Sequence, residues 1–362
     1  MKIGILSLNP GHNYGGILQS YALKTVLEQM GHEVKVISKY KPLKPSFSLL
    51  NIPRYCVRCI RLLLKKGDTP VFAEYYENKK GRIAFCNKYL NMKVIKNLNE
   101  IKPGEFDAIV VGSDQVWRPK YFEPQFQTKI ADAFLKFSDN WKIRRVAYAP
   151  SFGVDNWEYS DAQTEECSHL IKQFDGISVR EQTGVLMCKD YFDTDAICLC
   201  DPTILLTKKD YDNLITSDTP KPQGNLLVYC VDESTEVNKL VALVSREKKM
   251  NPFRIYSSTG VNPGVDSWLR AFKDAEFVIT DSFHACVFSL IFRKPFLVIG
   301  NKDRGISRFK TLLEVFGQSD RLLIKADDYK ASMEYSSLDD IDIVFENLRA
   351  TAINFLTQSL KK

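Results

Sequence analysis

One stretch, residues 275–301, constrains the fold more than any other part of the sequence. It reads AEFVITDSFHACVFSLIFRKPFLVIGN, with a short apolar run at Phe277–Thr280, a helical pattern at Ala285–Phe292 and a second apolar run at Phe296–Ile299. Two such runs joined by a helix form a βαβ unit, whose parallel strands are buried on both faces of a sheet. The sequence therefore predicts an α/β protein.

The polar residues of this stretch lie at the turn from the first strand into the helix. Asp281 or Ser282 can cap the helix, and the first amides and the dipole of the helix then face an anion. His284 stands in the first helical turn, where Asp281 is close enough to orient the imidazole. A core histidine bonded to a backbone carbonyl is the alternative, but the position after a buried strand favours a functional role.

The same succession of an apolar run and a polar cluster recurs along the chain. Further strands are predicted at Lys2–Leu8, Glu33–Ser38, Phe106–Val111, Arg145–Ala149, Gly176–Val179, Ala196–Cys200, Asn225–Val231 and Phe253–Tyr256. The polar clusters that follow them include Gly112–Trp117, Pro150–Gly153, Arg180–Glu181, Asp201–Thr203 and Ser257–Gly260. Open parallel sheets bind ligands at the carboxyl ends of their strands, so this pattern predicts a ligand site there.

The strands fall into two series, which predicts two domains. With 362 residues and 44% hydrophobic content, the chain can form two sizeable cores. Thr207–Gly224 is polar, contains two prolines and is the best candidate linker. We expect a first domain at 1–206 with a basic helical insertion near 41–100, the linker at 207–224, a second domain at 225–338, and a C-terminal helix at 339–362 that packs back toward the first domain. Two Rossmann-like domains would then face each other across a cleft.

A glycine-rich loop, Asn9–Gly16, follows the first predicted strand and reads NPGHNYGG. It does not match the G-x-G-x-x-G pattern, so it does not indicate a dinucleotide. Bare amides before a helix suit a phosphate or sugar hydroxyls, and a tight turn is the alternative.

Composition excludes several classes of function. The net charge of +6, from 50 basic and 44 acidic residues, permits an acidic ligand but gives no indication of nucleic acid binding. Nine scattered cysteines, an odd number, fit a reducing compartment better than a disulfide framework. Asn9–Gly11 interrupts the first apolar run before it could serve as a signal peptide, and Arg293–Lys294 interrupts the longest one. We therefore expect a soluble, cytoplasmic protein.

A basic segment at 54–66 allows two interpretations. Its basic residues recur at helical spacing among leucines and are Arg54, Arg58, Arg61 and Lys65. The pattern is typical of a solvated basic face over a buried one. The alternative is a helix on the inner face of an anionic membrane, which would suit a lipid-linked acceptor. Cys56 and Cys59 form a C-x-x-C without a second pair, which indicates buried thiols rather than zinc.

Five short blocks of the sequence resemble the polysaccharide pyruvyl transferase family, in the order the family has them. They are Asn13–Gly16 with Leu18–Leu23, Gly112–Trp117, Ile177–Glu181, Asp201–Thr203 and Thr280–His284. The resemblance extends from Asn13 to about Arg321. It implies a fold similar to that of the GT-B glycosyltransferases. It also implies an enzyme that moves the enolpyruvyl group of phosphoenolpyruvate onto two hydroxyls of a sugar in a polysaccharide or its lipid-linked precursor. The products would be a cyclic pyruvyl ketal and phosphate, and neither a cofactor nor a metal is expected.

The resemblance also implies roles for individual residues. His284 matches the essential histidine of the family and is expected to act as acid and base, with Asp281 orienting it. Many members have Arg-Leu-His where this chain has Ser-Phe-His, so Arg293, Arg304 or Arg308 would have to supply the missing charge. The expected donor-binding residues are Arg180, which matches an arginine implicated in binding phosphoenolpyruvate, with Ser282, Arg304, Arg308, Ser257 and Ser258. The expected acceptor-binding residues are Tyr14, Gly15, Gly16, Asp114, Gln115, Trp117, Ser151 and Asp201.

Other interpretations stay open at this point. Arg180 and Glu181 could form a structural ion pair, Asp114 and Asp201 could be turn and cap residues, and Trp117 could fill the cleft wall. A glycosyltransferase that uses a nucleotide sugar is compatible with the same fold, and so is a non-catalytic glycan-binding protein. Release of phosphate or of a nucleoside diphosphate distinguishes the first two functions, and donor turnover distinguishes both from the third.

Overall fold

The computed structural model describes residues 1–10, 13–39, 72–232, 234–255, 263–300, 305–330, 337–339 and 341–361. The basic segment at 54–66, its two cysteines, Ser257, Ser258 and Arg304 lie outside the described residues.

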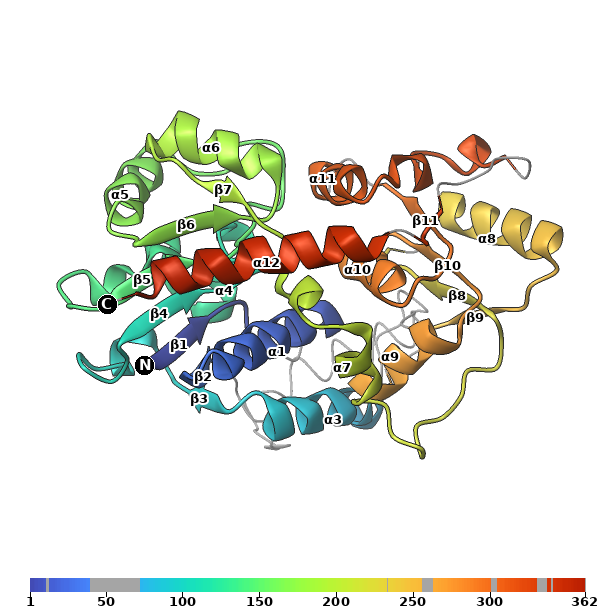
Figure 1. Cartoon of the computed structure of the whole chain (residues 1–362), viewed down its shortest axis with the longest axis horizontal. Coiled ribbons are helices and arrows are strands. Elements are labelled where there is room, and N and C mark those ends of the chain that lie inside the picture. The colour runs from blue at the N-terminus through green and yellow to red at the C-terminus, as the bar shows by residue number, and fades with distance from the viewer. Residues whose placement is uncertain are drawn as a thin grey trace.

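The first domain is built on a parallel sheet with the strand order β3-β2-β1-β4-β5-β6-β7 (Figure 1). Its strands are β1 (Lys2–Leu6), β2 (Glu33–Ser38), β3 (Met92–Val94), β4 (Ala108–Val111), β5 (Arg144–Ala147), β6 (Gly176–Val179) and β7 (Ile197–Cys198). The helices are α1 (Tyr14–Gln29), α3 (Phe72–Tyr89), α4 (Pro119–Phe126), α5 (Asp161–Ile171) and α6 (Gln182–Phe192). Alternate residues of a strand enter different cores. Ile3 and Ile5 pack with α1, whereas Leu6 packs with residues of α4, α5 and α6.

The second domain has a smaller parallel sheet with the strand order β12-β11-β10-β8-β9. Its strands are β8 (Leu226–Tyr229), β9 (Pro252–Arg254), β10 (Phe277–Thr280), β11 (Phe296–Ile299) and β12 (Leu322–Leu323). The helices are α7 (Lys208–Asp212), α8 (Thr235–Lys248), α9 (Val265–Asp274), α10 (Phe283–Ile291) and α11 (Ser307–Val315). Helix α8 covers one face of this sheet, and α9 and α10 cover the other.

The predicted fold class is confirmed, because both domains are α/β and every strand pair in them is parallel. Four predicted strands have the predicted bounds, namely β2, β6, β10 and β11. Other strands are shorter than predicted, since buried apolar residues such as Leu8 continue into loops beyond the last ladder pair. Two edge strands, β3 and β12, were not predicted. They are three and two residues long, too short for the apolar run on which the prediction depends.

The two domains share one hydrophobic core. Residues of β1, α1, α9, α10 and the C-terminal helix α12 (Ile341–Ser359) belong to a single buried cluster. Across the domain boundary the ring of Tyr14 stacks on Trp268 at 5.3 Å, and its hydroxyl donates to the carbonyl of Pro263 at 2.7 Å. This core holds the carboxyl ends of the two sheets toward each other.

Helix α12 runs from the second domain back along the first (Figure 1). Arg349 on this helix donates from Nε to the carbonyl of Ile204 at 2.8 Å and from Nη2 to that of Leu206 at 2.9 Å. The predicted linker begins with α7. Thr207 and Asp210 form a capping box at the amino terminus of this helix. Within the described residues, no helix is long and apolar enough to cross a membrane.

Candidate active site

The sheet topology places a cavity between the domains. In the first sheet β1 lies between β2 and β4, so the strand order reverses direction at β1. In the second sheet β8 lies between β9 and β10 in the same way. Such switch points form crevices at the carboxyl ends of the strands. A cavity of about 370 Å³ lies there, lined by Leu8, Asn13, Gly15, Asp114, Gln115, Tyr121, Gln125, Tyr229, Val231, Asp281, Ser282, Phe283, His284 and Arg308. Residues that follow β1, β4, β8 and β10 therefore meet in one place, which we call the central cavity.

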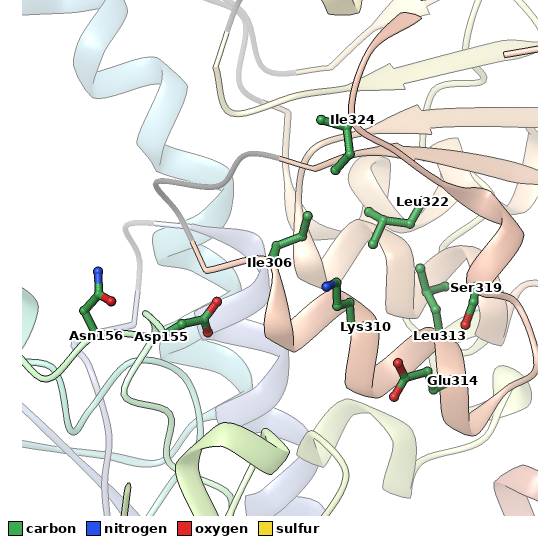
Figure 2. Close-up of a pocket in the computed structure, with 9 residues that line it drawn as sticks. All are labelled: Asp155, Asn156, Ile306, Lys310, Leu313, Glu314, Ser319, Leu322 and Ile324. Carbon is green, nitrogen blue, oxygen red and sulfur yellow. The ribbon is translucent and has the colours of Figure 1, made fainter. Parts of the chain in front are cut away.

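A larger hollow of about 680 Å³ lies between the loop at Asp155–Asn156 and the helix α11 (Figure 2). It is lined by apolar residues such as Leu322 with Lys310, Glu314 and Ser319, and it sits at the β12 edge of the second sheet. It holds neither the histidine nor the arginines of the site, so the chemistry belongs to the smaller central cavity.

His284 is held at the wall of the central cavity by residues of the first domain. Its Nε2 lies 3.5 Å from Oδ2 of Asp201, an ion-pair distance at the outer limit of a hydrogen bond. Because Nε2 is buried, Nδ1 is the ring nitrogen that reaches the cavity. The imidazole also packs directly on the backbone of Gly15, where a Cβ atom would lie 2.1 Å from Nδ1. Only glycine at position 15 leaves room for this ring.

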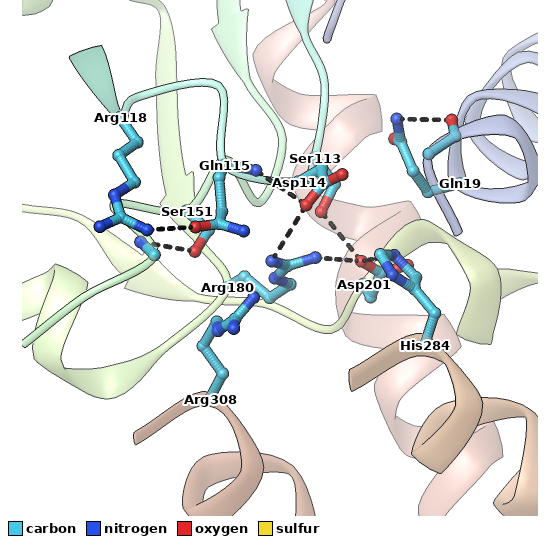
Figure 3. A network of polar contacts seen from close by, with 12 residues as sticks. Gln19, Ser113, Asp114, Gln115, Arg118, Ser151, Arg180, Asp201, His284 and Arg308 are labelled. Carbon is cyan, nitrogen blue, oxygen red and sulfur yellow. Dashed lines mark hydrogen bonds and ion pairs between the residues drawn. The ribbon is translucent and has the colours of Figure 1, made fainter. Parts of the chain in front are cut away.

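Asp201 belongs to a buried charge network (Figure 3). Its Oδ2 accepts hydrogen bonds from Nη1 of Arg180 at 2.8 Å and from the hydroxyl of Ser113 at 3.1 Å. Its Oδ1 accepts from the amide of Thr203 at 3.1 Å and from its hydroxyl at 2.7 Å. Nη2 of Arg180 lies 3.6 Å from Oδ1 of Asp114. A chain of alternating charges thus connects Asp114 to the imidazole.

The network sets the charge state of its members. Burial on its own would raise the pKa of Asp201, but the imidazole of His284 and the guanidinium of Arg180 outweigh it and hold that pKa well below its ordinary value. Burial would likewise lower the pKa of Arg180, but the carboxylates of Asp201, Asp114 and Glu181 raise it. Asp201 is therefore a carboxylate and Arg180 a cation at neutral pH.

Asp114 also reaches the central cavity. Its backbone φ of 71° is in the left-handed region, which aspartate tolerates better than most residues. Its Oδ1 accepts from the amide of Gln115 at 2.9 Å and faces Arg180. Oδ2 has no hydrogen-bond partner among the described residues, and Asp114 lines the cavity. One carboxylate oxygen of the first domain is thus open to a ligand.

Two guanidinium groups contact the ring of Phe283. The Cζ of Arg180 lies 4.4 Å from the ring centroid and that of Arg308 lies 5.9 Å from it. Arg180 is 97% buried and is not among the residues that line the central cavity, whereas Arg308 is. Burial and the charge of Arg180 lower the pKa of Arg308 to about 10, so it stays positive at neutral pH. Arg308 is therefore the described arginine that presents its charge to the cavity.

The amino terminus of α10 opens onto the same cavity without a side-chain cap. Ser282 occupies the N-cap position, but its hydroxyl makes no capping hydrogen bond. The oxygens of Asp281 accept hydrogen bonds from the amides of Val231 at 2.6 Å and Asp232 at 2.9 Å. The expectation that Asp281 orients His284 is therefore corrected. Asp281 fixes the loop after β8, and the carboxylate that faces the imidazole comes from the other domain.

The expected acceptor-binding residues separate into two groups. Gly15, Asp114 and Gln115 line the cavity, whereas Tyr14, Gly16, Trp117, Ser151 and Asp201 do not. Trp117 is completely buried, stacks on Phe134 at 4.7 Å and donates from Nε1 to the carbonyl of Ala133. The ring of Trp117 is fully packed in the core, so it cannot contact a sugar in this structure.

The others of this second group have structural contacts. The hydroxyl of Tyr14 is held by the second domain, and Asn13 caps α1 through the amide of Gly16. Ser151 donates to Glu181 at 2.9 Å, and Oδ2 of Asp201 faces Nε2 of His284. Burial raises the pKa of Glu181, although Arg180 and Arg308 oppose this. The alternative of an ion pair between Arg180 and Glu181 is not found among the described residues: Arg180 pairs with Asp201 and Asp114, and Glu181 accepts hydrogen bonds from Ser151 and from the amide of Phe152.

Sequence reasoning missed several residues of the cavity. Tyr121 and Gln125 come from α4, Tyr229 from the end of β8, and Leu8 and Asn13 from the loop after β1. Helix α4 follows the Gly112–Trp117 block directly, and Pro119 at its first position would have indicated a helix start after the polar cluster. In the described part of the chain, no group of three or more His, Cys, Asp or Glu residues is placed to hold a metal ion.

Comparisons with known proteins identify a family and a fold. The family model described as polysaccharide pyruvyl transferase matches residues 13–303. No curated protein sequence is similar enough to count as a relative. A structure from Listeria monocytogenes, named as a UDP-N-acetylglucosamine 2-epimerase, has a TM-score of 0.52 and 10% identity over 99% of this chain and 88% of its own. MurG of Acinetobacter baumannii has a TM-score of 0.40 and 11% identity over 99% and 94%. At such identity the epimerase shows the fold alone, which is that of the GT-B type.

Proposed function

Because the chain belongs to the polysaccharide pyruvyl transferase family, we propose that it transfers the enolpyruvyl group of phosphoenolpyruvate onto two hydroxyls of a sugar. The acceptor is a polysaccharide or its lipid-linked precursor, and the products are a cyclic pyruvyl ketal and phosphate. One observation carries the proposal. Two groups that can transfer protons, Nδ1 of His284 and Oδ2 of Asp114, come from different domains and face one cavity beside Arg308.

The donor side of the cavity suits a small, multiply charged anion. Phosphoenolpyruvate carries a carboxylate and a phosphate, and both need fixed positive charge or amide donors. Arg308 and the uncapped amides at the start of α10 supply these on the second-domain wall. Arg180 contacts the ring of Phe283, as Arg308 does, and adds to the positive potential on this side of the cavity. Its ion pairs with Asp114 and Asp201 reduce this effect. We assign donor binding to Arg308 and α10, with Arg180 in support.

We assign the acid and the base from their positions on opposite walls of the central cavity. His284 on the donor wall protonates the methylene carbon of phosphoenolpyruvate through Nδ1 while a sugar hydroxyl attacks the adjacent carbon. Asp114 on the opposite wall accepts the hydroxyl proton through Oδ2. The carboxylate of Asp201 faces Nε2, keeps a proton on that nitrogen and so leaves Nδ1 for the transfer.

The second half of the reaction uses the same groups. The first addition leaves a carbon that carries a methyl group, a carboxylate, a phosphate and the sugar oxygen. The C–O bond to phosphate breaks, and the second hydroxyl forms a new C–O bond and closes the ketal ring. The two acceptor hydroxyls lose two protons in total. The new methyl group takes up one proton, and the released phosphate carries the other. The reaction therefore balances without an oxidant, a reductant or a further co-substrate.

The test is incubation with phosphoenolpyruvate and a panel of lipid-linked oligosaccharides, scored by a mass gain for a pyruvyl ketal and by released phosphate. His284→Ala should lower turnover by about two to four orders of magnitude. Arg308→Met should mainly raise the KM for phosphoenolpyruvate by about tenfold or more, since it loses a charge-assisted contact. The exposed His169 of α5 supplies the matched control, and His169→Ala should behave as the wild type. Release of a nucleoside diphosphate from a nucleotide sugar, without ketal formation, would refute the proposal.

A further inference from the structure

The first-domain wall of the central cavity carries a group of uncharged side chains that donor binding and proton transfer do not use. Gln115 follows β4, and Tyr121 and Gln125 lie on α4. An aromatic ring beside carboxamide groups is the usual chemistry of a site for a neutral, hydroxyl-rich ligand. The hydrogen bonds of these residues show which polar atoms are left for such a ligand.

The carboxamide of Gln115 has a fixed orientation. Its Oε1 accepts a hydrogen bond from Nη1 of Arg118 at 3.1 Å, and arginine can only donate, so the oxygen must point to Arg118. Arg118 is itself held by two hydrogen bonds of 2.7 Å to the carboxylate of Glu158. The NH₂ group of Gln115 makes no hydrogen bond to any residue that the structure describes. It is a donor without a partner on a side chain that lines the cavity.

Gln125 is oriented by the same logic. Its Oε1 accepts from the backbone amide of Asn9 at 2.9 Å, and a backbone amide can only donate. The carbonyl of Gln125 also accepts from Nδ2 of Asn9 at 3.4 Å, which holds α4 to the loop after β1. Its NH₂ group, too, has no partner in the described part of the chain. The wall therefore offers a second fixed donor to the cavity.

Tyr121 lies between these two glutamines in the chain and is partly exposed. The guanidinium carbon of Arg118 lies 5.1 Å from the centroid of its ring, so Arg118 holds both the ring and the carboxamide of Gln115. Trp117, by contrast, is completely buried. Of the two aromatic residues, Tyr121 is the one that can pack against a ligand in the cavity.

We propose that Tyr121, Gln115 and Gln125 form the subsite for the acceptor sugar, a neutral pyranose whose oxygens accept hydrogen bonds from the two carboxamide NH₂ groups. The ring of Tyr121 packs against the apolar face of the pyranose. Arg118 is a positioning residue, which holds the ring and one carboxamide. This assignment rests on the proposed function for the identity of the ligand as an acceptor. It places the sugar on the first-domain wall, beside Asp114 and opposite His284.

The experiment measures sugar binding without a donor, so it does not depend on the transfer chemistry. Methyl glycosides of the common hexopyranoses and short oligosaccharides are titrated against the full chain by saturation-transfer NMR and calorimetry. Tyr121→Ala should weaken binding by about tenfold, whereas Tyr121→Phe should change it by less than about twofold, because the ring remains. Gln125→Glu keeps the oxygen that accepts from Asn9 but replaces the donor with a second acceptor, and should also weaken binding by about tenfold.

Matched controls come from exposed residues outside the cavity. Tyr191→Ala on α6 and Gln358→Glu on α12 should bind the glycosides as the wild type does. Thermal melting of each variant confirms that it is folded. Wild-type affinity in both Tyr121→Ala and Gln125→Glu, or no binding of any glycoside by the wild type, would overturn the proposal. Phosphate release from phosphoenolpyruvate in the same samples reports the proposed function separately.

Discussion

Replacement of Asp201 by asparagine probes how the site is held together. Asparagine has the same shape and keeps one oxygen for Thr203, but it removes the negative charge that faces Arg180 and His284. The side chain of Asp201 is fully buried, and Arg180 would keep Asp114 at 3.6 Å as a weaker partner in the network. Removal of one partner from a buried ion pair destabilises a protein by about 3–5 kcal/mol. We expect Asp201→Asn to lose stability of this order at neutral pH.

The loss of stability in Asp201→Asn should depend on pH. The pKa of Asp201 is lower in the folded protein than in the unfolded chain, because His284 and Arg180 outweigh the burial that would raise it. The stability contributed by its charge is therefore fully present above about pH 4 and is lost as the pH falls toward the folded pKa. The difference in unfolding free energy between the wild type and Asp201→Asn should shrink below about pH 4. Urea unfolding followed by tryptophan fluorescence measures this difference at about pH 7 and about pH 3.5, on either side of the unfolded pKa of aspartate.

The same variant should lose activity for a separate reason. If its oxygen stays with Thr203, the asparagine presents an NH₂ group to Nε2 of His284, so it no longer favours the tautomer with a proton on that nitrogen. We expect turnover to fall by about two to four orders of magnitude in the phosphate-release assay. Asp281→Asn is the comparison, and it should lose less turnover, because Asp281 accepts from backbone amides in the loop after β8. If Asp201→Asn unfolds and turns over like the wild type while Asp281→Asn is inactive, this reasoning is wrong.

Two further predictions follow from packing. Gly15→Ala would place a Cβ atom 2.1 Å from Nδ1 of His284, so the imidazole must move, and turnover should fall by about a hundredfold; normal phosphate release would contradict the contact. Trp117→Phe should lower the free energy of unfolding by about 1–3 kcal/mol through lost packing against Phe134, with no change in the acceptor KM. A raised acceptor KM at unchanged stability would instead place Trp117 in contact with the sugar.

Much of the fold could be predicted because it depends on local patterns. Strands such as Phe277–Thr280 and Phe296–Ile299 are runs of apolar residues buried on both sheet faces, and these runs are visible in the sequence itself. Parallel strands must place their carboxyl ends at one edge, so the polar residues after them, including Asp114 and His284, were expected near a ligand. The position of the site thus follows from periodicity and connectivity.

Which side chains touch each other was decided by tertiary structure. Asp281 is the neighbour of His284 in the chain, but its oxygens are taken by amides after β8, and the shared core brings Asp201 of the other domain to the imidazole. Neighbours in sequence limit what can meet, whereas the packing of two domains on one core selects what does meet. For the same reason Trp117, whose residue type suits a sugar site equally well, is buried, and Tyr121 takes its place at the cavity.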